Sequence, residues 1–338
     1  MTVTVARSLA EALDALLAEP APQVLAGGTD FMVEVNFGRR HPASVVVVNR
    51  VPELRSWRLE GDRVVLGAGV TYAELLRPPL ADLVPAMAQA ARTVGSPQIR
   101  NAGTLGGNLA TASPAGDALP VLLALGAEVE LVGPDRTRTL PVAELLLGPK
   151  RSACGPHELI TAVEIPARLG RQEMIKVGTR NAMVIAVASV CVVADPASGT
   201  VRVALGSVAP TVVRAEAAEA FCAEQLEAVP AGPGSLAGSR TDGHTGSTAD
   251  GSRADGSRAG GGPRPAGHAQ PDGARYRLSG GEDAYEHFGR LVAGAARPID
   301  DHRSSAGYRR HAVSVIATRA LRRVLDPYGD TELPGRAA

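Results

Sequence analysis

Apolar positions in the first half of the chain recur with the spacings of short helices and short strands. Leu9, Leu13, Leu16 and Leu17 follow Ser8 at helical intervals, and Ser8 is a suitable N-cap. Further helices are predicted at 31–37, 72–76 and 83–94. Compact apolar or β-branched runs predict strands at 24–25, 44–48, 64–66, 128–132 and 158–165. Residues 1–166 are therefore expected to mix short helices and strands without a regular βαβ array.

The pattern changes in the second half. A long β-branched run over 184–193 ends before Pro196, and a strand at 201–205 is expected to pair with it across a Pro-Ala-Ser-Gly turn. Helices are predicted at 215–221 and 304–325. The stretch from about 228 to 276 is rich in Gly, Ser, Pro and Arg and cannot bury enough apolar surface to offset its ordering entropy. A disordered insertion is predicted there.

Composition narrows the class of protein. The 338 residues are enough for two domains, 45% are apolar but only 3% aromatic, and the core must be built from Ala, Val and Leu. A formal net charge of +0 without a basic block argues against nucleic acid as a partner. No apolar run reaches about 18 residues, so no membrane span is expected, and the N-terminus lacks a signal-peptide pattern.

The three cysteines exclude several metal sites. Cys154, Cys191 and Cys222 are far apart in sequence and form no CxxC motif, so the chain offers neither a thiolate iron–sulfur site nor a zinc ribbon. An odd, sparse cysteine count suits a reducing compartment, and a cytoplasmic location is expected. Two histidines of the predicted insertion, His244 and His268, are interpreted as incidental, and no metal site is predicted.

Two glycine clusters carry the candidate chemistry. One contains Gly27 and Gly28 beside Thr29, and the other contains Gly103, Gly106 and Gly107 beside Thr104 and Asn108. Glycine lets a ligand approach the main chain closely, and several amides can then converge on an anion such as a diphosphate. Neither a Walker motif nor the GxGxxG fingerprint of a dinucleotide-binding βαβ unit is present. Two separate turns instead suggest a dinucleotide gripped from two sides.

The clusters, with their neighbours, resemble the FAD-binding medium subunits of molybdenum hydroxylases, of the xanthine dehydrogenase and aerobic carbon monoxide dehydrogenase type. The similarity rests on Ala26–Asp30 (Ala-Gly-Gly-Thr-Asp), on Ile99–Asn108 and on Thr111–Asp117. It extends to Glu158–Pro166 of the flavin domain and, in the second half, to 206–215 and 308–310. The resemblance covers nearly the whole chain except 223–280.

The resemblance implies an α+β fold. Residues 1–167 would form an FAD-binding domain of the vanillyl-alcohol-oxidase (PCMH) type, with subdomains at about 1–55 and 56–167. Residues 172–330 would form a C-terminal α/β domain like that of carbon monoxide dehydrogenase flavoproteins, an antiparallel sheet plus helices, with the insertion at 228–276 inside it.

The resemblance also assigns cofactor-binding roles, and no catalytic or metal-binding ones. Two loops would bind the diphosphate, Asp117 would contact the hydroxyl-bearing part of FAD, Val94 and Ile160 would pack near its rings, and Lys176 would lie near the flavin. The full predicted set is Val24, Leu25, Ala26, Gly27, Gly28, Thr29, Asp30, Phe31, Val94, Thr104, Gly106, Gly107, Asn108, Asp117, Ile160 and Lys176.

Plainer interpretations of these residues stay open. Thr104 and Asn108 could be ordinary turn caps, and Asp117 the N-cap of a helix. Val94 and Ile160 could be ordinary core, and Lys176 a solvated strand end. Because neither cluster contains histidine, FAD is expected to bind non-covalently.

By resemblance, the chain is the FAD-carrying electron-transfer subunit of a molybdopterin-dependent hydroxylase. Electrons would arrive from a small [2Fe–2S] subunit, fed by a large molybdopterin subunit, and leave to NAD⁺ or another acceptor. A dimer of heterotrimers is expected. The alternatives are a self-contained flavin oxidase of the same superfamily and a redox-inactive assembly subunit. The hydroxylated substrate and the final acceptor stay undetermined at this point.

Overall fold

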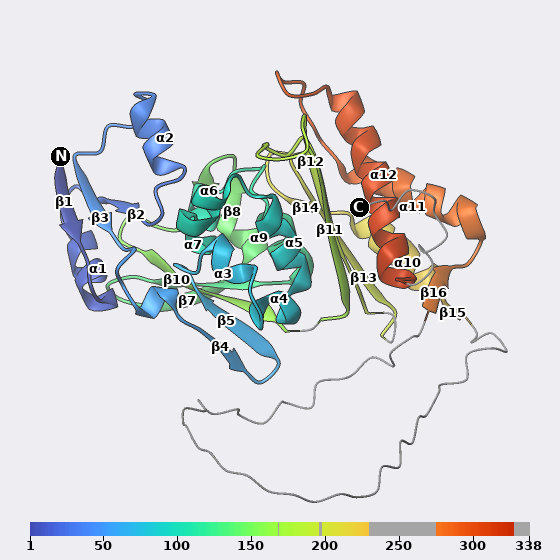
Figure 1. Cartoon of the computed structure of the whole chain (residues 1–338), viewed down its shortest axis with the longest axis horizontal. Helices are drawn as coiled ribbons and strands as arrows, with labels where there is room; N and C mark the ends of the chain where they lie inside the picture. The colour runs from blue at the N-terminus through green and yellow to red at the C-terminus, as the bar shows by residue number, and fades with distance from the viewer. Residues whose placement is uncertain (168, 196–197, 230–274, 328–338) are drawn as a thin grey trace, which may run out of the picture.

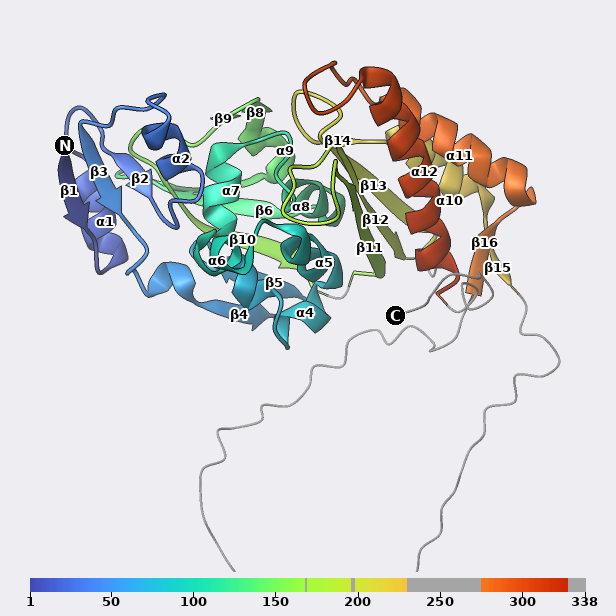
Figure 2. The same cartoon turned by 45° about the horizontal axis from the view of Figure 1, so that its top comes forward.

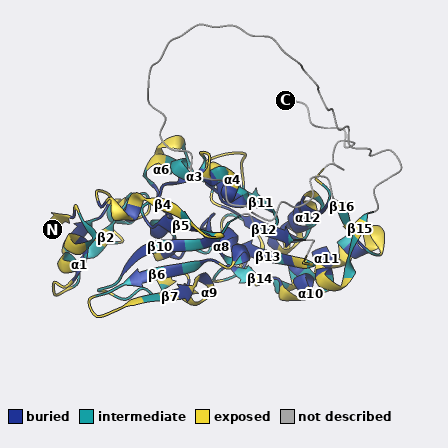
Figure 3. Ribbon diagram, turned by 90° about the horizontal axis from the view of Figure 1, so that it is seen from below, coloured by how far each residue is buried: buried dark blue, intermediate teal, exposed yellow. Residues whose placement is uncertain are grey.

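The chain folds into an α+β protein whose three units lie in a row (Figures 1 and 2). The structure, a computed structural model, describes residues 1–167, 169–195, 198–229 and 275–327. The inner strands of the two larger sheets and the helix faces against them are largely buried, and the exposed positions gather on outer strands, outer helices and turns (Figure 3). No helix among the described residues is both long and apolar enough to span a membrane.

The first unit is a small parallel sheet with two helices. Its strands lie in the order β1-β3-β2, and its elements are β1 (Thr2–Val5), α1 (Leu9–Leu16), β2 (Gln23–Leu25), α2 (Phe31–Asn36) and β3 (Ser44–Val47). Helix α1 begins at the predicted cap, because the Ser8 hydroxyl accepts the Glu11 amide. Strand β1 was not predicted, although its sequence, Thr-Val-Thr-Val, alternates polar and apolar side chains; all four residues are exposed.

The second unit is an antiparallel sheet in the order β4-β5-β10-β6-β7. Its strands are β4 (Trp57–Glu60), β5 (Arg63–Gly67), β6 (Glu128–Val132), β7 (Thr137–Pro141) and β10 (Leu159–Pro166), and β8 (Leu146–Gly148) and β9 (Arg151–Ser152) form a separate pair. Its helices are η1 (Glu53–Arg55), α3 (Tyr72–Leu75), α4 (Leu80–Leu83), α5 (Pro85–Thr93), α6 (Pro97–Ala102), α7 (Leu105–Thr111), α8 (Leu119–Leu125) and α9 (Val142–Leu145).

The second glycine cluster is helical rather than a plain turn. Helices α6 and α7 meet at Gly103, and each begins at a side-chain cap: Ser96 accepts the Ile99 amide and Thr104 accepts the Gly107 amide. Capping residues offset the low helix propensity of the glycines by satisfying first-turn amides. The sequence pattern had indicated only a loop here.

The third unit is an antiparallel sheet in the order β11-β12-β13-β14, covered on both faces. The strands are β11 (Arg171–Val177), β12 (Ala188–Asp195), β13 (Thr200–Gly206) and β14 (Val213–Arg214). Helices α5 and α8 of the second unit pack on one face, and α10 (Glu216–Gln225) and α12 (Ala306–Leu325) on the other, with α11 (Gly281–Ala295) outside them. Burial on both faces explains the continuous apolar run of β12.

Side chains on the two faces of this sheet enter two different cores, so the sheet packs against both the second unit and the C-terminal helices. Met174, Cys191 and Ala204 join the core of the second unit, whereas Val190 and Leu205 join the core beneath the C-terminal helices. The predicted pairing of the runs at 184–193 and 201–205 is confirmed, but β12 begins only at Ala188. The preceding residues form a loop.

Two short strands border the predicted insertion. Strands β15 (Leu226–Val229) and β16 (Arg275–Leu278) pair antiparallel, with Val229 opposite Arg275. The stretch predicted as disordered therefore begins and ends in strands: its first two residues, 228–229, belong to β15, and its last two, 275–276, belong to β16. The remainder, 230–274, lies outside the described residues.

Candidate functional site

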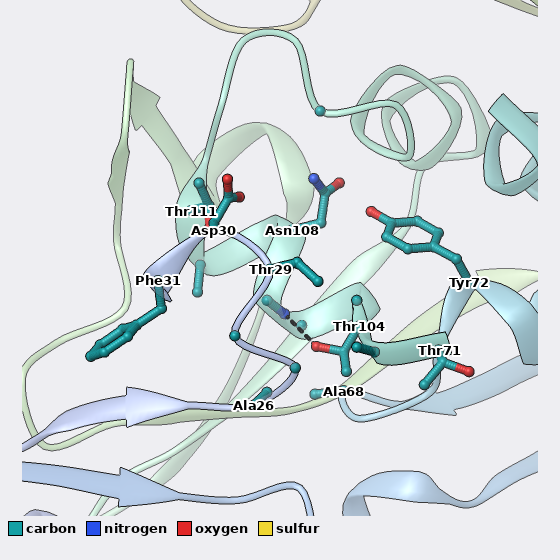
Figure 4. Close-up of a pocket in the computed structure, with 18 of the residues that line it drawn as sticks. Ala26, Thr29, Asp30, Phe31, Ala68, Thr71, Tyr72, Thr104, Asn108 and Thr111 are labelled. Carbon is teal, nitrogen blue, oxygen red and sulfur yellow. Dashed lines mark hydrogen bonds between the residues drawn. The ribbon is translucent and has the colours of Figure 1, made fainter. Parts of the chain in front are cut away.

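A cavity of about 740 Å³ lies between the three units (Figure 4). This volume falls within the range of about 300–1,000 Å³ typical of small-molecule sites. Every residue of the predicted set lines it except Lys176, so the two glycine clusters, about 75 residues apart in sequence, do meet. The three units contribute the loop after β2, helices α6 and α7 with the segment that follows, and the loop before β12, respectively.

The glycines bring backbone against backbone. A Cβ on Gly27 would overlap the carbonyl oxygen of Ala102 at the end of α6. A Cβ on Gly106 would come within 2.6 Å of the Ala68 Cβ and 2.9 Å of its carbonyl oxygen. The first contact joins the two clusters, and the second seats α7 against the segment after β5. In this structure, close approach is the main reason for glycine at both positions.

The amide groups of the two clusters differ in availability. In the second cluster the Gly106 amide donates to the Ala68 carbonyl, at 2.8 Å, and the Gly107 amide to the Thr104 hydroxyl, at 3.1 Å. In the first cluster, no acceptor among the described residues receives the amides of Gly27, Gly28 and Thr29. Free donors for an anion are thus concentrated in the first cluster. The second cluster shapes the wall.

Thr104 is the N-cap of α7 and is buried. Replacing it with valine, which has a similar shape, should leave the Gly107 amide without an acceptor and lower the free energy of unfolding by about 1–2 kcal/mol. Urea unfolding monitored by circular dichroism measures the loss. Thr104→Ser keeps the hydroxyl and should recover most of it. An unchanged midpoint for Thr104→Val would contradict the cap assignment.

Two buried oxygen atoms in the cavity wall have no hydrogen-bond partner among the described residues. They are Oδ1 of Asn108, on α7, and Oδ1 of Asp117, just before α8. Buried acceptors are rarely left unpaired, because an unmade hydrogen bond costs about 1–3 kcal/mol. Both residues line the cavity, so a ligand that carries hydroxyl or N–H groups would satisfy them. The Tyr72 hydroxyl points toward the same side as the Asn108 amide (Figure 4).

Asp117 is held from behind by Lys176. The Lys176 ammonium lies 2.7 Å from Asp117 Oδ2 and 3.2 Å from the Thr93 carbonyl, with both side chains under a tenth exposed. Burial raises the pKa of the Asp117 carboxyl, and the charge of Lys176 and its hydrogen bond partly offset that rise. Asp117 does not cap α8, whose N-cap is Ala118. Lys176 is not a solvated strand end, and it reaches the cavity only through the carboxylate.

Several lining residues carry no signal in the sequence. Tyr72 is buried, and desolvation raises the pKa of its hydroxyl. Arg40 and Lys150 both pair with Glu34 at the rim, although Lys150 lies 116 positions from Glu34 in the chain. Their pattern is that of ordinary surface charges. Only the packing of the second unit against the first brings Lys150 to Glu34.

The third unit contributes an apolar part of the lining. Met183, Val184 and Ile185 come from the loop between β11 and β12. Met183 and Ile185 are each more than half exposed, and Met183 has a positive φ of 50°. The sequence pattern had placed 184–187 in a strand. The left-handed residue and the turn around it end that strand pattern before Ala188.

No group of three or more His, Cys, Asp or Glu side chains within the described ranges is arranged to hold a metal ion. All three cysteines are free, and burial raises the pKa of the cavity-lining Cys154 thiol to about 11. A thiol with a raised pKa is a poor nucleophile near neutral pH. The cavity wall therefore presents hydrogen-bonding groups and apolar surface rather than a nucleophile or metal ligands.

Comparison with known proteins places the fold. Residues 1–168 match the model of the FAD binding domain in molybdopterin dehydrogenase. The chain is 33% identical over 199 residues to the carbon monoxide dehydrogenase medium chain of Hydrogenophaga pseudoflava. The aligned region covers 57% of this chain and 69% of that protein. It is 34% identical to the nicotinate dehydrogenase FAD-subunit of Eubacterium barkeri over 172 residues, 49% of this chain and 58% of that protein.

The solved structures extend the likeness over the second half. A chain of the Hydrogenophaga pseudoflava carbon monoxide dehydrogenase that lacks the Mo-pyranopterin moiety superimposes with a TM-score of 0.73 at 26% identity. The superposition covers 95% of this chain and 96% of that one. The order of units found here, including the C-terminal sheet and helices, is therefore that of the solved structure.

Proposed function

The chain belongs to the family of FAD-binding medium subunits of molybdenum hydroxylases, and from that premise we propose how it works. It binds FAD non-covalently in the cavity and relays electrons within a multi-subunit dehydrogenase. The observation that supports this most directly is the pair of unsatisfied acceptors, on Asn108 and Asp117, in a cavity where the first glycine cluster also leaves its amides free.

The residues present fit an extended dinucleotide. The amides of Gly27, Gly28 and Thr29 would hold the diphosphate, since clustered N–H groups bind anions without a basic side chain. Asp117 would accept from hydroxyl groups of the cofactor, as acidic residues do from ribose elsewhere. Val94 and Ile160, both on the lining, would pack on its rings. Among the described residues that line the cavity there is no histidine, which supports non-covalent binding.

Bound FAD would supply two-electron and one-electron redox chemistry, and the protein would supply position and electrostatics. Asn108 and Asp117 would orient the cofactor, and the buried Lys176 would place positive charge behind that contact. Met183 and Ile185 would keep water from part of the cavity. None of these tasks requires a general acid or base from this chain.

The remaining cofactors would lie on other subunits. We propose a small [2Fe–2S] subunit as electron donor and a large molybdopterin subunit as the site of substrate oxidation, in a dimer of heterotrimers. We propose NAD⁺ as the acceptor. The three free cysteines suit a reducing compartment, so we place the complex in the cytoplasm.

Flavin content tests the core of this proposal. The purified full-length chain, precipitated with acid, should release close to one FAD per polypeptide into the supernatant, with none left in the pellet. Reduction of the bound flavin by NADH without oxygen would support NAD⁺ as the acceptor. A folded chain that retains no flavin after incubation with FAD would refute the assignment, and flavin in the pellet would refute non-covalent binding. Bound flavin that dithionite cannot reduce would favour an assembly role.

A further inference from the structure

Arg309, on α12, is buried where two backbone segments of the third unit meet, and it is not one of the proposed cofactor-binding residues. Its side chain is 5% exposed, and it donates from Nη1 to the carbonyls of Val187, at 2.7 Å, and Ser207, at 2.8 Å. Its Nη2 lies 2.7 Å from Oδ1 of Asp301. One guanidinium therefore joins two separate segments of the third unit and is itself fixed by a carboxylate.

Both segments continue into the cavity wall. Val187 follows Met183, Val184 and Ile185, which line the cavity, and its amide is bonded to the Val177 carbonyl. The amide of Ser207 donates to the Pro114 carbonyl at 2.8 Å, and the residues on either side of Pro114 line the cavity. The guanidinium thus bonds Val187, two positions after the lining residue Ile185, and Ser207, whose amide bonds Pro114 between two lining residues.

The local geometry requires an external hold. Ser207 has a positive φ of 64°, a conformation that a non-glycine residue adopts only when its surroundings impose it. Asp301 in turn is fixed by the amides of Arg303 and Ser304. Although burial alone would raise the pKa of Asp301, these amides and Arg309 lower it to about 2, so the carboxylate stays charged opposite Arg309 at physiological pH.

We infer that Arg309 is a positioning residue for the cofactor cavity: it fixes the loop at 183–187 and the turn at 206–208 against the wall formed by 113–117. It acts through these backbone segments and does not line the cavity itself. The inference rests on the proposed function, in which the ligand of that cavity is FAD. Lysine is not an equivalent, because it lacks the rigid fork that reaches two carbonyls and a carboxylate at once.

Hydrogen exchange of the full-length chain without FAD, followed by FAD titration, tests the inference. Arg309→Lys should speed exchange at the amides of Val187 and Ser207 by roughly tenfold to a hundredfold, the factor expected for lost hydrogen bonds to a charged group. Its dissociation constant for FAD should rise by a similar factor below the melting temperature. Asp301→Asn should change both in the same direction, and it serves as the test if Arg309→Lys does not fold.

The matched control is Arg322→Gln, which removes an exposed ion pair with Glu282 from the same helix and should change neither measurement. Unchanged exchange in a folded Arg309→Lys protein overturns the inference. So does an unchanged dissociation constant in a variant whose exchange has increased, because the hydrogen bonds of Arg309 would then have no effect on FAD binding. If the wild-type chain binds no FAD, the proposed function fails, and the exchange measurement alone decides whether Arg309 holds the two segments.

Discussion

Gly27→Ala should yield a folded chain that binds FAD much more weakly than the wild type. The new methyl group would overlap the Ala102 carbonyl oxygen, and the Gly103 amide nitrogen lies only 3.1 Å away. Neither neighbour can rotate aside, because both are backbone atoms. The loop after β2 would have to move away from the end of α6, which separates the two halves of the cavity wall.

The expected size of this effect follows from overpacking. Forcing a methyl group into a filled site costs about 1–3 kcal/mol, and each ~1.4 kcal/mol is a tenfold change in affinity. We expect the dissociation constant for FAD to rise roughly tenfold to a hundredfold, with a smaller effect on unfolding, because the first unit keeps its own core. Isothermal titration with FAD, beside urea unfolding of the apoprotein, separates the two.

Gly148→Ala is the control for this prediction. A Cβ at Gly148 meets no atom within 4 Å, and Gly148 does not line the cavity. FAD affinity should match that of the wild type. Wild-type affinity in Gly27→Ala would show that the two clusters need not touch, and the site as described would then be wrong.

Lys176→Met should lower the free energy of unfolding more than Thr104→Val or Gly27→Ala. The substitution leaves the buried Asp117 carboxylate without its cation, and removing one partner of a buried pair costs about 3–5 kcal/mol. Arg290→Met, at an exposed pair with Glu286, should cost little, because water screens it. Urea unfolding at neutral pH measures both losses.

The pH dependence of this loss has a definite sign. Burial already raises the pKa of Asp117, and without Lys176 the pKa rises further. An acid whose pKa is higher in the folded state binds its proton more readily there, so the penalty grows as pH rises above the unfolded pKa of about 4. The deficit of Lys176→Met should thus shrink between neutral pH and about pH 5.

A second substitution distinguishes charge from packing. Adding Asp117→Asn to Lys176→Met removes the uncompensated charge, so the double variant should be more stable at neutral pH than Lys176→Met alone. A deficit that is the same at both pH values, and that Asp117→Asn does not relieve, would show that Lys176 contributes only through packing.

Much of the local structure followed from short-range rules. Ser8 was predicted where it caps α1, because a capping residue acts within one turn. The strand pair β12–β13 followed from a β-branched run and a turn between them. Strand β1 was missed although Thr-Val-Thr-Val has the two-residue period of a strand, because four residues are the shortest run in which that period is recognised.

The cavity lining separates what a sequence motif can indicate from what only tertiary packing decides. Both glycine clusters were visible as motifs, because close backbone approach demands a particular residue type whatever lies opposite. That Gly27 opposes Ala102, and that the amides of Gly106 and Gly107 already have acceptors, depends on how α6 and α7 pack. Motif spacing contains no information on which amides remain free.

Local periodicity and the requirement for glycine sufficed for a mixture of helices and strands and for the two glycine clusters, and the resemblance to a known family supplied the α+β class and most of the lining. Packing between the units decided that Lys176 stands behind Asp117, that Lys150 meets Glu34, and that α12 reaches the wall through Arg309. Those contacts join residues up to 122 positions apart. No pattern of neighbouring residues encodes such separations, because they arise only when the sheets and helices bury their apolar faces against one another.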